Sequence, residues 1–206
     1  MRTRSYSLAI ALLVVVWVLT LFIAVPGLKG PDTVSSATVA PPKISTISPT
    51  SGKPGASITV TGTVFGTSRG TSSVMFGTKK ASSYVSWSSG KIVVKVPTGV
   101  WGSQHLTVKA AGGPSNYKVF HIVPKITSRS PSSGGPGAIV TINGSAFGST
   151  RGTSSVWFGA KKVTAYSSWI NTTIKAKLPP GLSGSARIKV VVNGGGISNL
   201  MSFTAL

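Results

Sequence analysis

Short stretches of alternating apolar and polar residues recur along the chain from residue 42 onward. In ASITVTG, Ile58 and Val60 fall on one face, and in HLTVKA, Leu106 and Val108 do the same. Segments rich in glycine and proline, such as SPTSGKPG, separate these stretches. Alternation with a period of two, punctuated by turn residues, is typical of β-strands with one buried face. The pattern therefore predicts many short strands and little helix.

The chain contains the same unit twice. Aligned without gaps, residues 42–111 and 124–193 are identical at 34 of 70 positions. After an inserted residue, SNYKVF at 115–120 corresponds to SNLMSF at 198–203. Identity at this level over a fixed spacing indicates a tandem duplication.

Each copy has about seven predicted strands, which is enough for two antiparallel sheets packed face to face. We therefore expect an all-β fold of two immunoglobulin-like β-sandwiches, named domain 1 (residues 42–123) and domain 2 (residues 124–206). The end of domain 1, FHIV, runs directly into PKI at the start of domain 2. We expect no flexible linker between them.

Both copies resemble the IPT/TIG domain family. The resemblance rests on PKISTISPTSGKPGASITVTGTVFG at 42–66, on PKITSRSPSSGGPGAIVTINGSAFG at 124–148, and on the later VMFG and VWFG. It extends over residues 42–206 and implies immunoglobulin-like modules. Such modules occur in surface receptors, in bacterial envelope and carbohydrate-active proteins, and in DNA-binding factors of the Rel type, so the resemblance indicates a fold rather than a ligand.

The N-terminus has the pattern of an export signal or membrane anchor. Arg2 and Arg4 precede an uncharged apolar run of 18 residues, 8–25. That length suits a membrane span, and the preceding arginines favour a cytoplasmic N-terminus with the domains outside. We expect a signal peptide or signal anchor over 1–27 and a linker rich in Pro, Ser and Thr over 28–41.

Charge and composition exclude several functions. The chain carries 21 Lys and Arg against one acid, Asp32, and has no cysteine. Nine of the basic residues fall in each domain. Without paired carboxylates or thiols, the common acid–base, hard-cation and thiolate sites cannot form. The two histidines, His105 and His121, alternate with inward positions and are expected on outer faces. We therefore predict no catalysis, no cofactor and no metal site.

The candidate site comes from a phrase that both domains repeat, GTSRGTSSVMFGTKK at 66–80 and GSTRGTSSVWFGAKK at 148–162. Its glycine, valine and phenylalanine positions are explained by turns and packing, whereas its basic residues are not. Two tryptophans that the other copy lacks add flat rings, which stack on sugars or bases. For one of them, Trp157, contact with the neighbouring domain is an equal alternative. The candidate ligand-binding residues are Arg69, Lys79, Lys80, Trp101, Arg151, Trp157, Lys161 and Lys162.

These features predict a non-catalytic surface protein, secreted or anchored in the membrane by its N-terminal segment. Its expected partners are anionic or saccharide polymers of a cell envelope or matrix, because a surface with one sign of charge attracts polyanions. One alternative is a structural spacer or assembly subunit with protein partners and no specific ligand. Another is nucleic-acid binding of the Rel-like type. The sequence has no base-reading motif, so the charge favours only non-specific contact with nucleic acid.

Overall fold

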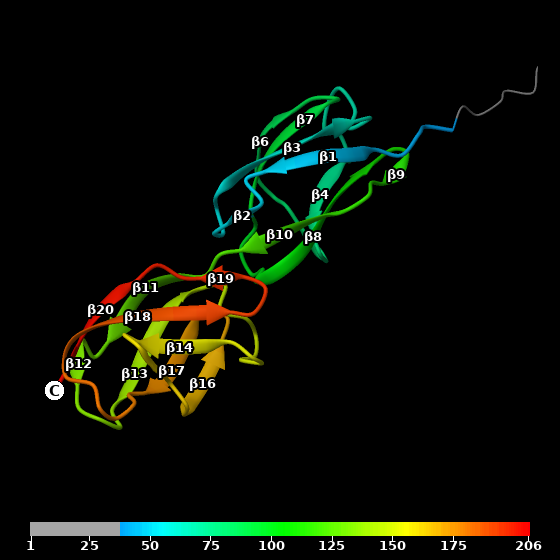
Figure 1. Ribbon diagram of the computed structural model, residues 1–206. Helices are drawn as coiled ribbons and strands as arrows, with labels where there is room; N and C mark the ends of the chain where they lie inside the picture. The colour runs from blue at the N-terminus through cyan, green and yellow to red at the C-terminus, as the bar shows by residue number, and fades with distance from the viewer. Residues whose placement is uncertain (1–37) are drawn as a thin grey trace, which may run out of the picture. The chain divides into compact units, whose positions relative to one another are not determined.

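The computed structural model of the protein describes residues 38–206 (Figure 1). Within this range the regular elements are twenty β-strands, in two successive sets of ten. The predicted apolar segment 8–25 lies outside the described residues. Among the residues that are described, no helix has the length and apolar character needed to cross a membrane.

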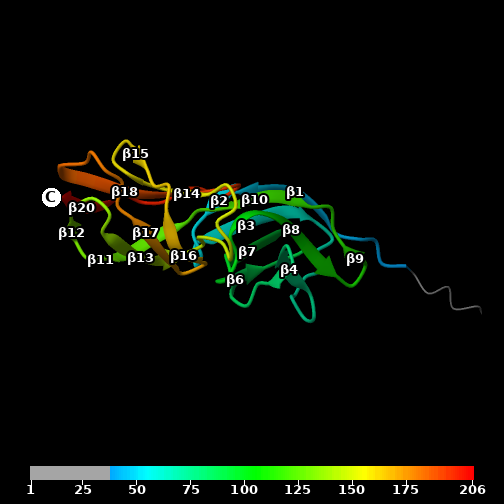
Figure 2. The ribbon, with the colours of Figure 1, turned by 90° about the horizontal axis from the view of Figure 1, so that it is seen from below.

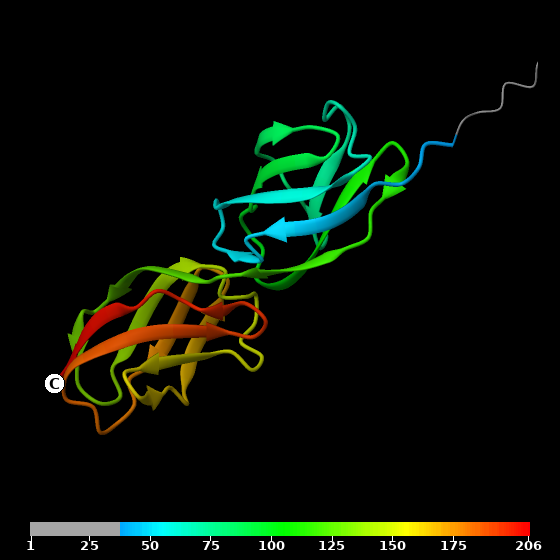
Figure 3. The same cartoon turned by 45° about the horizontal axis from the view of Figure 1, so that its top comes forward.

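Domain 1 is a sandwich of two sheets, as the alternation predicts. One sheet has the strand order β1-β3-β7-β6, and the other β2-β10-β8-β4-β5 with β9 beside β8. In Figure 3, the blue and cyan strands β1 and β3 lie side by side in the first sheet. The strands are β1 (Lys43–Ser48), β2 (Ser51–Gly52), β3 (Ser57–Thr63), β4 (Ser73–Phe76), β5 (Lys79–Lys80), β6 (Tyr84–Trp87), β7 (Lys91–Lys95), β8 (Gly102–Ala110), β9 (Gly113–Pro114) and β10 (Lys118–Ile122).

Domain 2 repeats this topology strand for strand. Its sheets have the orders β11-β13-β17-β16 and β12-β20-β18-β14-β15, with β19 beside β18. In each domain seven strands have four residues or more, as predicted, and three have only two. The strands are β11 (Lys125–Ser130), β12 (Ser133–Gly134), β13 (Ile139–Ser145), β14 (Ser155–Phe158), β15 (Lys161–Lys162), β16 (Tyr166–Ile170), β17 (Thr173–Lys177), β18 (Gly184–Val192), β19 (Gly196–Ile197) and β20 (Met201–Ala205).

The inward positions of the alternating stretches form the two cores. Ile58, Val60, Leu106 and Val108 are at most 1% exposed, which confirms the predicted strand faces. In each six-stranded sheet, two buried phenylalanine rings from different strands pack edge to face. The centroids of the two rings lie 5.6 Å apart in domain 1 and 5.1 Å apart in domain 2. Burial of these apolar side chains stabilises both sandwiches.

The connection between the domains is short. β10 ends at Ile122 and β11 begins at Lys125, so only two residues separate the last strand of domain 1 from the first strand of domain 2. The Ser103 hydroxyl donates a hydrogen bond to the carbonyl oxygen of Gly194 at 2.9 Å. That this short connection is not flexible stays a prediction.

Candidate ligand-binding face of domain 2

Strand β14 places Trp157 on the outer face of the six-stranded sheet of domain 2. Its neighbours in sequence, Val156 and Phe158, are fully buried in the core. Because successive side chains of a strand point to opposite faces, Trp157 points outward. It is half-buried. Figure 2 shows β14 together with β15 and β18, the strands that pair with it on either side.

A lysine stands opposite Trp157 on each neighbouring strand. Lys162 of β15 and Lys189 of β18 are its cross-strand partners. The ammonium nitrogen of Lys189 lies 5.4 Å from the centroid of the Trp157 ring, within the range of a cation–π interaction. We call these three residues, Lys162, Trp157 and Lys189, the tryptophan–lysine row.

A hydrogen bond holds the indole in place. The Trp157 Nε1–H donates to the hydroxyl oxygen of Ser155 at 3.0 Å, and Ser155 itself is only 5% exposed. The polar edge of the ring is therefore already satisfied by the protein. Such an arrangement leaves the apolar ring surface as the part of Trp157 that a ligand would use.

The row is strongly positive. Residues 38–206 contain no Asp or Glu, so neither Lys162 nor Lys189 has a side-chain carboxylate within the described part of the chain. An ordinary protein surface mixes both signs of charge, and this one does not. The local potential therefore attracts anions to both sides of the indole.

Domain 1 carries an incomplete version of the row. Met75 takes the place of Trp157, and it pairs with Lys80 on β5 and with Thr107 on β8. Domain 1 thus has one of the two cations and no ring. The serine beneath the ring is retained, because Ser73 of domain 1 corresponds to the serine that bonds the indole in domain 2.

Lys189 was not among the residues that the sequence singled out. It is 32 positions from Trp157 and becomes its neighbour only through the pairing of β14 with β18. A signal for it is present in the alignment of the two copies. The positions of Met75 and Thr107 change together to Trp157 and Lys189, and the structure shows that they are cross-strand partners in both domains.

The two predicted arginines have a packing role that the sequence did not reveal. The guanidinium carbon of Arg69 lies 5.2 Å from the centroid of the Tyr84 ring, and that of Arg151 lies 5.3 Å from that of Tyr166. Both tyrosines pack against their domain core, as expected. The repeated arginine is therefore explained in part by cation–π contact.

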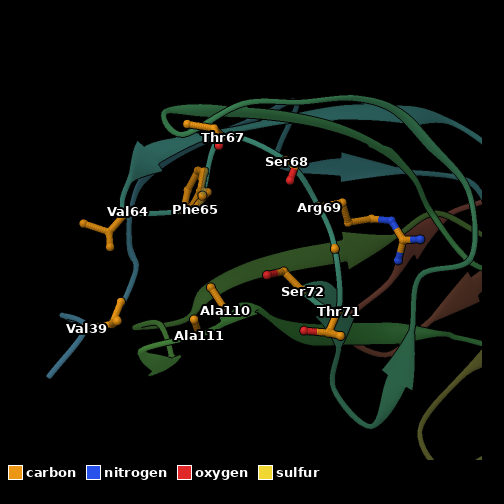
Figure 4. Close-up of a pocket in the computed structure, with 12 residues that line it drawn as sticks. Val39, Val64, Phe65, Thr67, Ser68, Arg69, Thr71, Ser72, Ala110 and Ala111 are labelled. Carbon is orange, nitrogen blue, oxygen red and sulfur yellow. The ribbon is translucent and has the colours of Figure 1, made fainter. Parts of the chain in front are cut away.

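A shallow hollow of about 310 Å³ lies beside the first of these arginines, between loop 66–72 and the end of β8 (Figure 4). Thr71 and Ser72 contribute hydroxyl groups to it, and Val64 and Val39 contribute apolar groups. The Arg69 side chain extends away from these two hydroxyls in Figure 4. The Arg69 guanidinium therefore does not point toward the hydroxyl groups of the hollow.

The remaining predicted residues do not meet at one point. Lys79, Lys80 and Lys161 are exposed on the short edge strands β5 and β15. Trp101 is 38% exposed, and a Cβ atom on Gly148 of domain 2 would lie 3.2 Å from its Cδ1 atom. Trp101 is thus the tryptophan next to the neighbouring domain, whereas the two contacts described above for Trp157 lie within domain 2.

The two histidines are exposed, as predicted. The His105 ring stacks on Tyr117 with centroids 4.1 Å apart, and Nδ1 of His121 lies 2.8 Å from the carbonyl oxygen of Gly194. Within residues 38–206, no three His, Cys, Asp or Glu side chains gather as metal ligands would.

The tryptophan–lysine row combines a ring that can stack on a flat or ring-shaped ligand with lysines that attract negative charge. This combination suits the binding of a ligand.

A family model of the IPT/TIG domain matches residues 42–122 and again residues 124–205. Cyclomaltodextrin glucanotransferase from Bacillus sp. (strain 6.6.3) is 38% identical over 109 residues, which is 51% of this chain and 15% of the enzyme. The enzyme of the same name from Bacillus licheniformis is 40% identical over 101 residues, 47% of this chain and 14% of the enzyme. The chain thus spans about one seventh of the length of these curated relatives.

Two SGBP-B proteins are among the solved structures to which the chain is similar. SGBP-B from a xyloglucan utilization locus of Bacteroides uniformis is 18% identical with a TM-score of 0.35, covering 80% of this chain and 49% of that one. The surface glycan-binding protein PbSGBP-B from Prevotella bryantii is 19% identical with a TM-score of 0.47, covering 80% and 41%.

Proposed function

The chain belongs to the IPT/TIG domain family, and we propose that its two domains form a non-catalytic binding protein for saccharide or anionic polymers. The main contact site is the outer sheet face of domain 2. Trp157 supplies a ring for stacking, and the lysines on either side of it supply positive charge. Domain 1 adds non-specific attraction through its nine basic residues.

The position of Trp157 between two cross-strand lysines carries this proposal. An aromatic ring beside cations is the combination that binds chain polymers with flat units and negative charge. Domain 1 has the same strands, the same serine and the same edge lysine, but not the ring. The tryptophan is therefore not required by the fold, which supports a role in binding.

The related sequence segments point to a saccharide. They occur in cyclomaltodextrin glucanotransferases, whose name denotes enzymes that act on glucans. A non-catalytic module in such an enzyme can bind the glucan polymer on which the active site acts. This chain carries two copies of a related module, and we propose that they also bind a saccharide.

We further propose that both domains lie outside the cytoplasmic membrane. The arginines before the apolar segment 8–25 favour export of the two domains, and the segment either anchors the chain or is removed. Sequencing the N-terminus of the mature protein from fractionated cells tests this. Recovery of an intact N-terminus in the cytosolic fraction would contradict it.

Binding of the full chain to heparin, an acidic polysaccharide, tests the proposed site. Trp157→Met, which installs the residue found in domain 1, should weaken binding by about 1–3 kcal/mol, because a stacking ring is lost. The matched control is Trp101→Ser, which installs the residue of domain 2 at the corresponding place and should leave heparin binding within about twofold of wild type, since Trp101 lies outside the row.

The salt dependence of heparin binding separates the electrostatic contribution of the basic residues from the stacking contribution of Trp157. Affinity for heparin should fall steeply between about 0.05 and 0.2 M salt, because basic residues release counterions from the polymer. Replacing Arg69, Lys79, Lys80, Arg151, Lys161 and Lys162 by glutamine should weaken binding and flatten this dependence. If neither salt, nor this set, nor Trp157→Met changes heparin binding, the polymer does not bind through these residues and the proposed site is wrong.

A further inference from the structure

The Lys189 side chain lies over the ring on which a sugar would stack. Its ammonium group lies 5.4 Å from the centroid of the Trp157 ring, and a hydrogen bond joins Nε1 of the indole to the Ser155 hydroxyl. A sugar that stacks on the ring face over which the ammonium lies must therefore move the Lys189 ammonium. What becomes of that ammonium afterwards decides which ligands bind.

A neutral sugar and an acidic sugar differ at this step. A neutral sugar removes the ammonium from the ring and offers it no charge in return, so the cation–π interaction is lost. An acidic sugar presents a carboxylate or sulfate to the displaced ammonium, and a charge-assisted hydrogen bond replaces the lost interaction. The geometry therefore favours the acidic sugar.

Residues 38–206 offer the displaced ammonium no anionic side chain. They contain neither Asp nor Glu, so within the described part of the chain an anionic partner for Lys189 comes from the ligand. In a surface of mixed charge, a nearby carboxylate would accept the displaced lysine and the selectivity would vanish. The absence of acidic side chains from residues 38–206 thus favours acidic ligands at this site.

Lys162 extends the same preference to the other side of the ring. It pairs with Trp157 from β15, whereas Lys189 pairs with it from β18. Two strand spacings separate the backbones of the two lysines, which is about 10 Å. A polymer with charges on successive units can contact both lysines while one unit covers the ring.

Resting on the proposed function, we infer that the tryptophan–lysine row selects acidic saccharides, those bearing carboxylate or sulfate groups, over neutral glycans, and that Lys189 determines this specificity. The row requires sugar ring and charge on one molecule. A neutral glucan lacks the charge, and a polyphosphate lacks the ring.

Three probes test the inference on the full chain: dextran, its carboxymethyl derivative, and inorganic polyphosphate. The two dextrans share a backbone and differ in charge alone. Wild type should prefer carboxymethyl dextran to dextran. Lys189→Thr, which installs the residue of domain 1, should bind dextran about two- to fivefold more tightly than wild type does, because the ring is uncovered. The same variant should lose most of the preference for the carboxymethyl form.

Two further variants make the outcomes distinct. Trp157→Met should reduce binding of carboxymethyl dextran and leave polyphosphate binding unchanged. Lys109→Thr removes one of the nine cations of domain 1 outside the row. Its ratio of carboxymethyl dextran to dextran affinity should fall only slightly, through the lost non-specific attraction, whereas the ratio of Lys189→Thr should fall much further.

An unchanged affinity ratio in Lys189→Thr, with weaker carboxymethyl dextran binding in Trp157→Met, overturns the selectivity of Lys189 and leaves the proposed function standing. Equal binding of carboxymethyl dextran by wild type and Trp157→Met overturns the proposed site itself. Equal loss of carboxymethyl dextran and polyphosphate binding in Lys189→Thr, with dextran binding and circular dichroism unchanged, also overturns the inference, because it shows attraction by charge alone.

Discussion

The guanidinium carbon of Arg151 lies 5.3 Å from the centroid of the Tyr166 ring, and the same pair recurs in domain 1. The Tyr166 hydroxyl accepts a hydrogen bond from the Val156 amide at 2.9 Å and donates one to the Val163 carbonyl at 3.1 Å. The phenol thus joins the loop of the repeated phrase to the strand that carries Trp157.

Tyr166 should make domain 2 sensitive to high pH. Burial raises the pKa of its phenol above the ordinary value of 10.0, against the lowering effects of the Val156 hydrogen bond and of Arg151. The folded protein therefore holds this proton more tightly than the unfolded chain. The resulting stability is complete below about pH 10 and is lost as the pH rises through the folded-state pKa.

Chemical unfolding of wild type and Tyr166→Phe between pH 8 and pH 11 tests this effect. At pH 8 the variant should be less stable by about 1–3 kcal/mol, because the Val156 amide and Val163 carbonyl lose their partner. Above about pH 10 the difference should shrink as the wild-type phenol ionises. A difference that stays constant over the whole range would refute the proposed titration.

Domain 1 should accept a complete row. Met75→Trp with Thr107→Lys installs the domain 2 residues beside Lys80, and Ser73 is already present to bond the indole. We expect titration calorimetry with a short acidic oligosaccharide to show a second binding site in the full chain. Met75→Trp alone serves as control and should bind more weakly at that site, lacking the second cation. No added site in the double variant would show that the row is insufficient.

Arg129 should destabilise domain 2. Its Nε atom is buried without a hydrogen-bond partner among residues 38–206, while Nη2 donates to the Ser202 hydroxyl at 3.3 Å. Domain 1 has Ile47, 8% exposed, at the same position. Arg129→Ile should raise the free energy of unfolding by about 1–2 kcal/mol, since a buried unsatisfied donor is removed. The reverse change, Ile47→Arg, should lower that of domain 1, and opposite signs in thermal melts would contradict this account.

Gly144 should tolerate no side chain. A Cβ atom there would collide with the backbone carbonyl of Lys125 and with the Phe147 ring. Gly144→Ala should therefore destabilise domain 2 by about 3 kcal/mol or more, because the carbonyl belongs to a paired strand and cannot move away freely. Gly135→Ala is the matched control: its Cβ atom would meet nothing within 4 Å, and thermal melting should show little change. Equal melting temperatures for the two variants would refute the argument.

Acid should leave the fold intact. Asp32, the single acidic side chain, lies outside both domains, so neither domain has a side-chain carboxylate whose lowered folded-state pKa gives stability that is lost as pH falls. Thermal melts of the full chain at fixed ionic strength should change by only a few degrees between about pH 5 and pH 2. Added salt should raise the melting temperature, since it screens repulsion among 18 domain cations. A large drop toward pH 2 would contradict this explanation.

Much of the fold could be read from the sequence because the relevant signals are local. Alternation in ASITVTG and HLTVKA defines which side chains enter the core, and glycine-rich segments define where strands end. The duplication identifies two equal domains, and the outward position of Trp157 follows from its place between Val156 and Phe158. The lack of acidic residues is a matter of composition and needs no structure.

Contacts between distant residues depend on how the strands pair. Lys189 becomes the partner of Trp157 only because β14 pairs with β18, and Arg151 meets Tyr166 only because a loop folds back onto the core. Strand pairing joins residues that are far apart in the chain. The alternation of apolar and polar residues within one strand does not reveal which residue of another strand lies opposite. The strands, the two domains and the charge are therefore properties of the sequence alone, whereas the folded sheet determines which lysine covers the ring.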